Sequence, residues 1–335
     1  MAGARRRGGP AVRHHRAAAS RGAVRRRLPG SELAVTRVVA VVGPTAAGKS
    51  ALSLRLAHEL DGEVVNADSM QLYRGMDIGT AKLTLAEREG VPHHVLDIWD
   101  VTEPASVAVY QRLARAAIDD IAARGRVPLL VGGSGLYVRA VLEDFDFPGT
   151  DTALREALEQ ELAEVGPEAL HARLRSTDPE AAERILPGNG RRIVRALEVN
   201  ALTGTTFTAR LPSQPRPVYD ALQLGVDVDT AVLDGRIETR VEAMWAAGLV
   251  DEVRTLEAAG LRSGRTAGAA LGYKQILDYF SGQSDEATAK AETVRATRRF
   301  VRRQRSWFRR DGRIVWLDGG AGDITAAALE IVRQD

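Results

Sequence analysis

Residues 43–50, with the sequence GPTAAGKS, constrain the fold of this chain more than any other segment. They match a phosphate-binding loop, in which backbone N–H groups surround the phosphates, the lysine contacts them and the serine hydroxyl holds Mg²⁺. The β-branched run at 38–42 predicts a buried strand, and residues 51–57 have the apolar spacing of a helix. This setting predicts a phosphate site formed by Gly43, Pro44, Thr45, Ala46, Ala47, Gly48, Lys49 and Ser50, with Ser50 as the metal ligand.

The composition is typical of a globular protein without membrane segments. The 335 residues are 44% hydrophobic and 27% charged, and no run of 18 apolar residues predicts a membrane-spanning helix. The chain has no cysteine, which excludes disulfides, thiol catalysis and thiolate metal sites. We therefore expect a cytoplasmic protein with no membrane partner.

The positive charge of the chain is concentrated at its N-terminus. Residues 1–31 hold nine arginines and no acid, so the formal net charge of +2 becomes −7 without those nine arginines. Because the segment has no hydrophobic periodicity, we interpret residues 1–35 as a disordered tail. A nucleic-acid arm, an organelle transit segment and a start codon placed too far upstream are all compatible with it, and a functional arm is the less favoured account.

Strands alternate with helices on both sides of the middle of the chain. Strand-like runs follow the first one at 63–67, 95–99, 127–131, 222–226 and 313–317. Helical spacing covers 105–123, 230–247, 249–259, about 286–310 and about 323–333. This alternation predicts an α/β fold with a P-loop NTPase-like parallel sheet flanked by helices, whose ligands bind at the carboxyl ends of the strands.

The middle of the chain has a different character. Four segments have the spacing of short amphipathic helices, at 154–165, 168–176, 179–185 and 191–203, and strand-like runs are missing there. We therefore predict an all-helical insertion at 147–218. It would interrupt a catalytic core made of residues 36–146 and 219–335.

The predicted helix near the C-terminus is strongly basic. Its arginines fall within an arc of roughly 160° at 100° per residue, and they are Arg295, Arg298, Arg299, Arg302, Arg303, Arg305, Arg309 and Arg310. The other half of the helix carries Val294, Phe300, Val301, Trp307 and Phe308. Residues 295–310 contain no acid, so the arginines repel one another unless acids elsewhere in the fold or a polyanion pair with them. The pattern favours a polyanion such as RNA.

The commonest use of a phosphate-binding loop, ATP or GTP chemistry, meets an objection in this sequence. Such enzymes usually carry an acid at the end of a second apolar strand to help hold Mg²⁺, whereas the strand at 127–131 is followed by glycines and Ser134. Asp68 follows the strand at 63–67 directly. A carboxylate there could assist a metal or act as a general base, and both roles stay open at this level.

Eight blocks of this sequence, in order, resemble the tRNA dimethylallyltransferase family. They are GPTAAGKS at 43–50, NADSMQLYRGMDIGTAK at 66–82, PHHVLDI at 92–98, LLVGGSGLY at 129–137, RRIVRALE at 191–198, RIETR at 236–240, GYK at 272–274 and ATRRFVRRQRSW at 296–307. The resemblance spans roughly residues 37–320, and the second block is highly specific.

The resemblance implies transfer of a dimethylallyl group from dimethylallyl diphosphate to N6 of adenosine 37, in tRNAs that read codons beginning with U. It implies Asp68 as the general base, and Arg240, Thr45, Lys49 and a Mg²⁺ on Ser50 as stabilisers of the departing diphosphate. The loop would then hold pyrophosphate, which explains the missing acid. Ser134 stands where the family commonly has threonine, and its hydroxyl keeps the ability to hydrogen-bond near Asp68 or the diphosphate.

The same resemblance implies where the tRNA binds. The target base would be extruded from the anticodon loop into a channel, while the helical insertion contacts the anticodon stem-loop. The implied tRNA-binding residues are Asp68, Ser69, Met70, Gln71, Arg155, Arg191, Arg192, Arg195, Tyr273, Arg298, Arg299, Arg302 and Arg303. Tyr273 could stack on a base or pack in the core. The family also implies a monomer.

Three other functions compete with this one. An adenylate isopentenyltransferase would modify a free nucleotide, which needs neither the basic helix nor the helical insertion. A small-molecule kinase would use the loop for ATP, and a catalytically silent RNA-binding protein would have no use for Asp68. The neighbouring His93 and His94 are weak metal candidates, because adjacent residues of a strand point to opposite faces.

Overall fold

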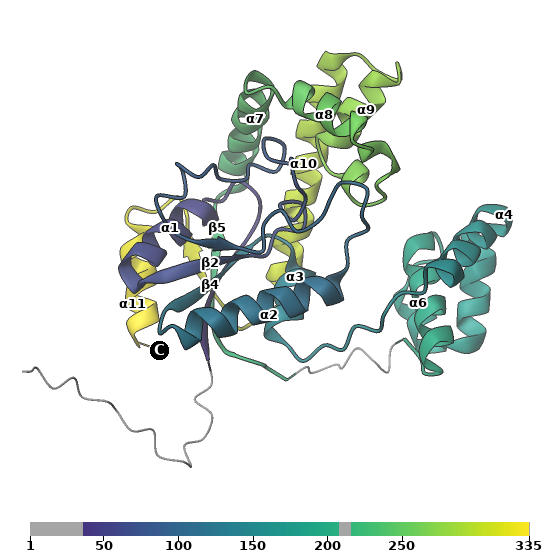
Figure 1. The fold of residues 1–335 in the computed structure, drawn as a ribbon, viewed down its shortest axis with the longest axis horizontal. Helices are drawn as coiled ribbons and strands as arrows, with labels where there is room; N and C mark the ends of the chain where they lie inside the picture. The colour runs from purple at the N-terminus through teal and green to yellow at the C-terminus, as the bar shows by residue number, and fades with distance from the viewer. Residues whose placement is uncertain (1–35, 208–215, 335) are drawn as a thin grey trace, which may run out of the picture. The chain divides into compact units, whose positions relative to one another are not determined.

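A parallel sheet forms the centre of the computed structural model, which describes residues 36–207 and 216–334. The predicted tail at 1–35 lies outside these residues. The strands are β1 (Arg37–Val42), β2 (Gly62–Asn66), β3 (His93–His94), β4 (Val127–Gly132), β5 (Asp220–Asp227) and β6 (Ile314–Asp318). They are all parallel, in the order β3-β2-β4-β1-β5-β6 (Figure 1), so the predicted fold class is confirmed.

The helices of the core follow the predicted order, with two additions. They are α1 (Lys49–Leu60), α2 (Val107–Ala123), α3 (Gly135–Leu142), α7 (Thr230–Ala246), α8 (Leu249–Ala258), α9 (Tyr273–Phe280), α10 (Glu286–Phe308) and α11 (Ile324–Gln334). Helices α3 and α9, and the 3₁₀ turns η2 (Leu261–Ser263) and η3 (Ala267–Ala269), are absent from the sequence prediction. Each has at most eight residues, which is too few turns for a clear apolar period.

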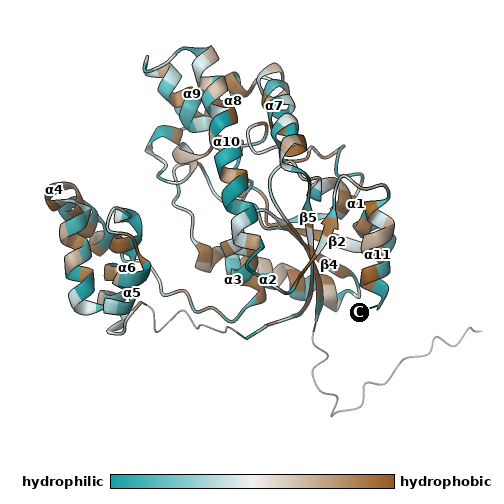
Figure 2. Ribbon diagram, turned by 180° about the vertical axis from the view of Figure 1, so that it is seen from behind, coloured by the Kyte–Doolittle hydropathy of each residue, from teal (hydrophilic) through white to brown (hydrophobic). Residues whose placement is uncertain are grey.

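Alternating side chains of β1 explain why helices cover both faces of the sheet. Val39 and Val41 join a hydrophobic cluster with residues of α1, α7 and α11. Val38, Ala40 and Val42 join the opposite cluster, with residues of α2 and α3. All five side chains are at most 1% exposed, as expected for a parallel strand buried on both faces. Figure 2 shows the corresponding hydrophobic colour along the strands.

The described residues between α3 and β5 form only helices and loops, apart from one isolated bridge at Pro217. The helices are α4 (Thr152–Thr177), α5 (Pro179–Arg184) and α6 (Gly190–Thr203), and they bury a hydrophobic cluster of their own. The two helices predicted at 154–165 and 168–176 are the two halves of α4, which is interrupted at Gly166 with φ 81° and followed by Pro167. The boundaries of the insertion domain stay a prediction.

The strand predicted at 95–99 is wrong. Only His93 and His94 pair with β2, and the chain then leaves the sheet because Val95 and Asp97 have φ values of 60° and 55°. Such left-handed residues cannot continue a strand. The segment instead wraps around the loop after β2, where the N–H groups of Ile98 and Trp99 both donate to Leu72 O.

None of the helices in the described residues combines the length and the apolar composition that a membrane-spanning helix requires.

Candidate active site

The loop at 43–50 joins the carboxyl end of β1 to the first turn of α1, as predicted. Gly43 has φ 139°, and a Cβ there would lie 2.2 Å from Val226 O on the neighbouring strand β5. Gly48 has φ 104° at the N-cap of α1. Because other residues rarely adopt such φ values, both glycines are required for the turn that exposes the N-terminus of α1. A helix N-terminus attracts anions.

Lys49 is held inside this loop. Its Nζ donates to Pro44 O at 2.8 Å. Burial lowers the pKa of Lys49 to about 8, while Asp68 opposes this shift and Arg240 adds to it. Residues from three separate segments therefore act electrostatically on one another at the end of the sheet.

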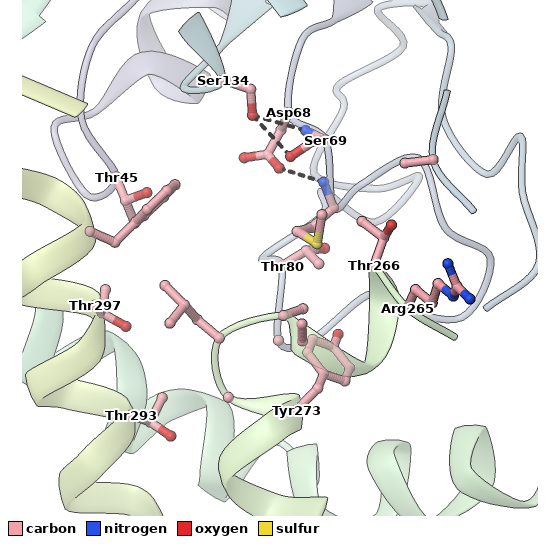
Figure 3. A pocket seen from close by; sticks show the side chains of 18 of the residues that line it. Thr45, Asp68, Ser69, Thr80, Ser134, Arg265, Thr266, Tyr273, Thr293 and Thr297 are labelled. Carbon is pink, nitrogen blue, oxygen red and sulfur yellow. Dashed lines mark hydrogen bonds between the residues drawn. The ribbon is translucent and has the colours of Figure 1, made fainter. Parts of the chain in front are cut away.

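Asp68 lies just beyond the carboxyl end of β2 and is oriented by its neighbours. Its N–H donates to Asn66 Oδ1 at 2.9 Å, and its Oδ1 accepts a hydrogen bond from Met70 N at 2.9 Å. Its other carboxylate oxygen, Oδ2, accepts none from any described residue. In Figure 3 the Asp68 carboxylate and Thr45 lie across the same pocket from each other. Asp68 is thus a carboxylate held in place with one oxygen available to a ligand.

Ser134 follows β4, which pairs with β2, so the parallel register brings it beside the Asp68 segment. Its Oγ accepts a hydrogen bond from Ser69 N at 3.1 Å and donates to Ser69 Oγ, also at 3.1 Å (Figure 3). Ser134 therefore holds the residue next to Asp68 instead of bonding to its carboxylate. Gln71 is also held, because its amide donates to Thr80 O at 3.1 Å.

Arg240 projects from α7 toward the same pocket and is half-buried. It makes no hydrogen bond or ion pair with any residue that the structure describes. Burial lowers the pKa of Arg240, and the charge of Asp68 raises it. A half-buried guanidinium without an anion invites an anionic ligand.

The pocket has a volume of about 930 Å³ and combines a charged side with an apolar side. Its charged and polar lining includes Thr45, Asp68, Ser134 and Arg240. Its apolar lining comes from α7, α8, η3 and α10, and includes Ile237, Val241, Met244, Leu249, Ala269 and Phe300. A ligand with an anionic head and an apolar group fits this division.

Tyr273 is fully buried, and its role as a base-stacking residue stays a prediction. Its ring is so close to Gly79 that a Cβ there would lie 2.5 Å from it, and its hydroxyl donates to Glu252 Oε1 at 2.6 Å. Glu252 also accepts hydrogen bonds from three successive backbone N–H groups, at 77–79. The alternative left open by the sequence, packing in the core, describes Tyr273 in this structure.

Acids elsewhere in the fold neutralise part of the basic face of α10. Arg298 pairs with Glu238, and both Arg298 and Arg302 lie 3.6 Å from Asp234. Arg305 and Arg309 share Asp227, each at 3.0 Å, and Arg295 pairs with Glu292 on α10 itself. Among the described residues, Arg299, Arg303 and Arg310 have no carboxylate partner, and all three are exposed. The expected all-arginine face is therefore reduced to these three.

One residue of the predicted packing face of α10 is exposed instead of buried. Val301 and Phe308 are buried, but Trp307 is 44% exposed. The buried row continues through Gln304, which is 5% exposed and which the sequence prediction did not include. The spacing 301, 304, 308 was a signal for its burial, because these positions share one helix face.

Of the four arginines predicted to bind tRNA from the helical insertion, two pair with an acid and two are exposed. Arg155 and Arg195 both bind Glu198, a fully buried carboxylate, at 2.6 and 2.8 Å. Arg191 and Arg192 are exposed at the first turn of α6 and pair with no acid that the structure describes. Arg155, Arg191 and Arg195 contribute to the lining of the pocket.

The two adjacent histidines have structural partners. His94 Nε2 lies 2.6 Å from the buried Glu63, which also binds Arg124 and Arg126. His93 Nδ1 lies 2.9 Å from Val91 O. No cluster of three or more His, Asp or Glu side chains suited to a metal occurs within the described residues.

The affinity for inorganic pyrophosphate is expected to fall as the pH rises through about 8. Lys49 carries its charge below its pKa of about 8 and loses it above, so binding at higher pH requires uptake of a proton. Calorimetric titration with pyrophosphate at several pH values between about 7 and 9 measures this change of affinity. A Lys49→Arg variant, whose charge does not titrate in this range, controls for titration of pyrophosphate itself. Parallel profiles for the two proteins would contradict the expectation.

The comparisons with known proteins identify the family of this chain. The family model described as IPP transferase matches residues 71–311. The tRNA dimethylallyltransferase of Salinispora arenicola is 72% identical over 296 residues, which cover 88% of this chain and 86% of that protein. The enzyme of the same name from Salinispora tropica is 70% identical over 304 residues, covering 91% of this chain and 95% of that protein.

Two solved structures share the fold. The tRNA isopentenylpyrophosphate transferase of Bacillus halodurans is 41% identical with a TM-score of 0.67, over 89% of this chain and 96% of that chain. A eukaryotic dimethylallyltransferase acting on tRNA is 27% identical with a TM-score of 0.75, over 88% of this chain and 78% of that chain. The resemblance inferred from the sequence is confirmed, and the chain belongs to the IPP transferase family.

Proposed function

We propose that this protein transfers a dimethylallyl group from dimethylallyl diphosphate to N6 of adenosine 37 in tRNAs that read codons beginning with U. The observation that carries the proposal is that Asp68 and Arg240 line one pocket and that both act electrostatically on Lys49 of the phosphate-binding loop. Two cations and a phosphate-binding loop suit a diphosphate, and a carboxylate with a free oxygen suits a base. The names of the similar proteins support the dimethylallyl group and the tRNA of this proposal.

The proposed reaction forms one bond and breaks another at the same carbon. The N6 nitrogen forms a bond to C1 of the dimethylallyl group, while the C1–O bond to diphosphate breaks and its electron pair leaves with the diphosphate. The amine loses a proton, which Asp68 Oδ2 accepts. An adenine amine is a poor nucleophile, so positioning in the pocket supplies much of the rate enhancement.

The charge that develops on the leaving diphosphate meets groups already in place. The N–H groups at the N-terminus of α1 and the side chains of Lys49, Thr45 and Arg240 would bind its oxygens. Because Arg240 lacks an acidic partner among the described residues, it needs little rearrangement to do so. The apolar lining from α7, α8 and α10 would hold the dimethylallyl chain and exclude water.

The chain's donor set fits a Mg²⁺ ion that arrives with the diphosphate. Mg²⁺ commonly binds through few protein ligands, substrate phosphates and water, which agrees with a loop that offers the exposed Ser50 and no carboxylate cluster. Ser50 and the diphosphate oxygens would hold the ion. When bound, it would neutralise part of the negative charge of the diphosphate.

The tRNA would bind where exposed arginines remain available. Arg299 and Arg303 on α10, and Arg191 and Arg192 on α6, are the proposed contacts to the RNA backbone. Figure 2 shows α10 largely in the hydrophilic colour. Arg303 also lines the pocket, so a base extruded into it would pass close to this side chain.

The double variant Arg299→Ala/Arg303→Ala is expected to weaken tRNA binding and to lower the slope of log K against log salt by about 1–2. Each arginine that contacts a phosphate releases about one counterion, and these two have no acid partner among the described residues. Arg298→Ala/Arg302→Ala is the matched control on the same helix, because those arginines already pair with Asp234 and Glu238. An equal change of slope in both variants would show that the ion pairs do not decide which arginines bind RNA.

Incubation with dimethylallyl diphosphate, Mg²⁺ and unmodified tRNA, followed by mass spectrometry of the nucleosides, tests the proposed function. We expect dimethylallyl-adenosine at position 37 and release of pyrophosphate. Modification of free AMP but not of tRNA would favour the adenylate isopentenyltransferase alternative. Turnover of ATP without a mass gain on adenosine would favour a kinase and contradict the proposal.

A further inference from the structure

Gln304 is a buried polar residue at the meeting point of three segments of the proposed active site. It belongs to α10, and its side chain reaches between the phosphate-binding loop and the end of β4. Its Oε1 accepts a hydrogen bond from Thr45 N at 2.9 Å, and its Nε2 donates to Gly133 O at 2.9 Å. Both ends of the amide are therefore used, one at the phosphate-binding loop and one after the end of β4.

The first hydrogen bond acts on a peptide unit that also orients Lys49. Thr45 N–H and Pro44 C=O belong to the same peptide bond. Gln304 binds its N–H, and Lys49 Nζ binds its oxygen at 2.8 Å. Rotation of this peptide would move the lysine's acceptor and redirect the N–H groups of the loop. Gln304 thus opposes rotation at the point where the loop would contact the diphosphate.

The second hydrogen bond acts on the opposite side of the site. Gly133 precedes Ser134, which binds Ser69, the residue next to Asp68. The packing here is close, because a Cβ on Gly133 would lie 2.4 Å from Gln304 Nε2 and 3.3 Å from Gly43 O. A chain of contacts therefore runs from Gln304 through Gly133 and Ser134 to the segment that carries the proposed base.

We propose that Gln304 is a positioning residue that holds the phosphate-binding loop in its diphosphate-binding form and in register with the Asp68 segment. The proposal rests on the function proposed above. Gln304 touches neither substrate and acts through the Pro44–Thr45 peptide and through Gly133. An apolar side chain of the same size would fill the space but leave Thr45 N–H and Gly133 C=O free to turn.

The variant Gln304→Met tests this role, with Gln111→Met as its matched control. Methionine keeps the length of the side chain and removes both hydrogen bonds. Gln111 is a second buried glutamine, 9% exposed, whose amide donates twice, to Ala140 O at 2.8 Å and to Phe145 O at 2.9 Å, and it does not line the pocket. The two variants lose similar interactions in the core, but only one of them acts on the loop.

The decisive measurement is the affinity for inorganic pyrophosphate, determined by calorimetry. Gln304→Met is expected to weaken it about tenfold, since two neutral hydrogen bonds that hold the loop are lost. The KM for dimethylallyl diphosphate should rise by a similar factor, while the KM for tRNA stays within about twofold. Gln111→Met should lower the melting temperature comparably and leave pyrophosphate affinity unchanged.

The outcomes separate this inference from the proposed function. Wild-type pyrophosphate affinity in a folded Gln304→Met protein, or equal losses in both variants, would overturn the role of Gln304 even if the wild type modifies tRNA. A wild type that binds pyrophosphate but does not prenylate tRNA would contradict the proposed function, and the pyrophosphate comparison would still decide about Gln304. If Gln304→Met does not fold, Gln304→Ala replaces it, with Gln111→Ala as its control and the same expected contrast.

Discussion

Replacement of Asp68 by asparagine is expected to lower the single-turnover rate of prenyl transfer by about 10²- to 10⁴-fold, the usual contribution of a general base. Asparagine keeps an oxygen that accepts the hydrogen bond from Met70 N, so the loop should hold its shape. It cannot accept the proton from N6. Rapid-quench measurement with saturating enzyme, followed by nucleoside analysis, gives this rate without interference from binding.

Asp100→Asn is the matched control for that experiment. Asp100 lies between β3 and α2, is exposed and pairs with Arg74 at 2.8 Å. This variant should keep nearly the wild-type rate. The affinities for pyrophosphate and tRNA should also change little in Asp68→Asn, because its effect belongs to the chemical step. A rate within tenfold of the wild type in Asp68→Asn would mean that another group or water takes the proton.

Replacement of Arg240 by methionine is expected to lower kcat/KM for dimethylallyl diphosphate by about 10²- to 10³-fold, the scale of losing one donor that stabilises a developing anion. The variant keeps an apolar side chain of similar length beside Val241 and Ile237. It removes a half-buried positive charge that has no acidic partner among the described residues, so the fold should be as stable as the wild type or more so. Steady-state kinetics measure the fall of kcat/KM, and thermal unfolding measures the stability of the fold.

Arg254→Met is the control for the charge change. Arg254 lies on α8, is exposed and pairs with Asp251, and it does not line the pocket. Its loss should leave kcat/KM within about twofold. If Arg240→Met loses activity only in parallel with its melting temperature, a structural role for Arg240 would explain the result and the diphosphate contact would be refuted.

Local patterns predicted the parts of the fold that depend on local physics. The run at 38–42 is β-branched and apolar throughout, which indicates a strand buried on both faces, and β1 is such a strand. The motif after it has glycines at fixed positions, and Gly43 and Gly48 have positive φ values, which favour glycine. Long helices with many turns, such as α10, were also predictable.

Elements that depend on distant contacts were not predictable in the same way. The segment 95–99 is apolar enough for a strand, but Val95 and Asp97 have positive φ values. Its backbone N–H groups at 98 and 99 donate to Leu72 O and not to a neighbouring strand. Helix α9 is short, and its first residue is held by Glu252 from α8. In both cases partners far away in the sequence decide the local conformation.

The residues of the site can also be separated into those that local patterns predict and those that depend on distant contacts. The phosphate-binding loop and Asp68 could be identified because each follows a strand with a local signature. The role of Gln304 and the absence of a described partner for Arg240 could not be predicted, because hydrogen-bond partners are set by the packing of α7 and α10 on the sheet. The arginines of α10 show both effects. Their spacing gave the basic face, but the ion pairs to Asp234 and Asp227 decide that Arg299 and Arg303 remain free of such partners within the described residues.

The sequence by itself determined a parallel α/β fold with a phosphate site, because β-branched runs, glycine positions and helical spacing act over a few residues. It also carried the resemblance that the family match confirms. The tertiary structure decided how charges are paired and which groups face one another across the pocket. Electrostatic interactions and hydrogen bonds depend on distances of a few ångströms between segments such as β1, β2 and α10. Such distances exist only once the sheet has brought the segments together.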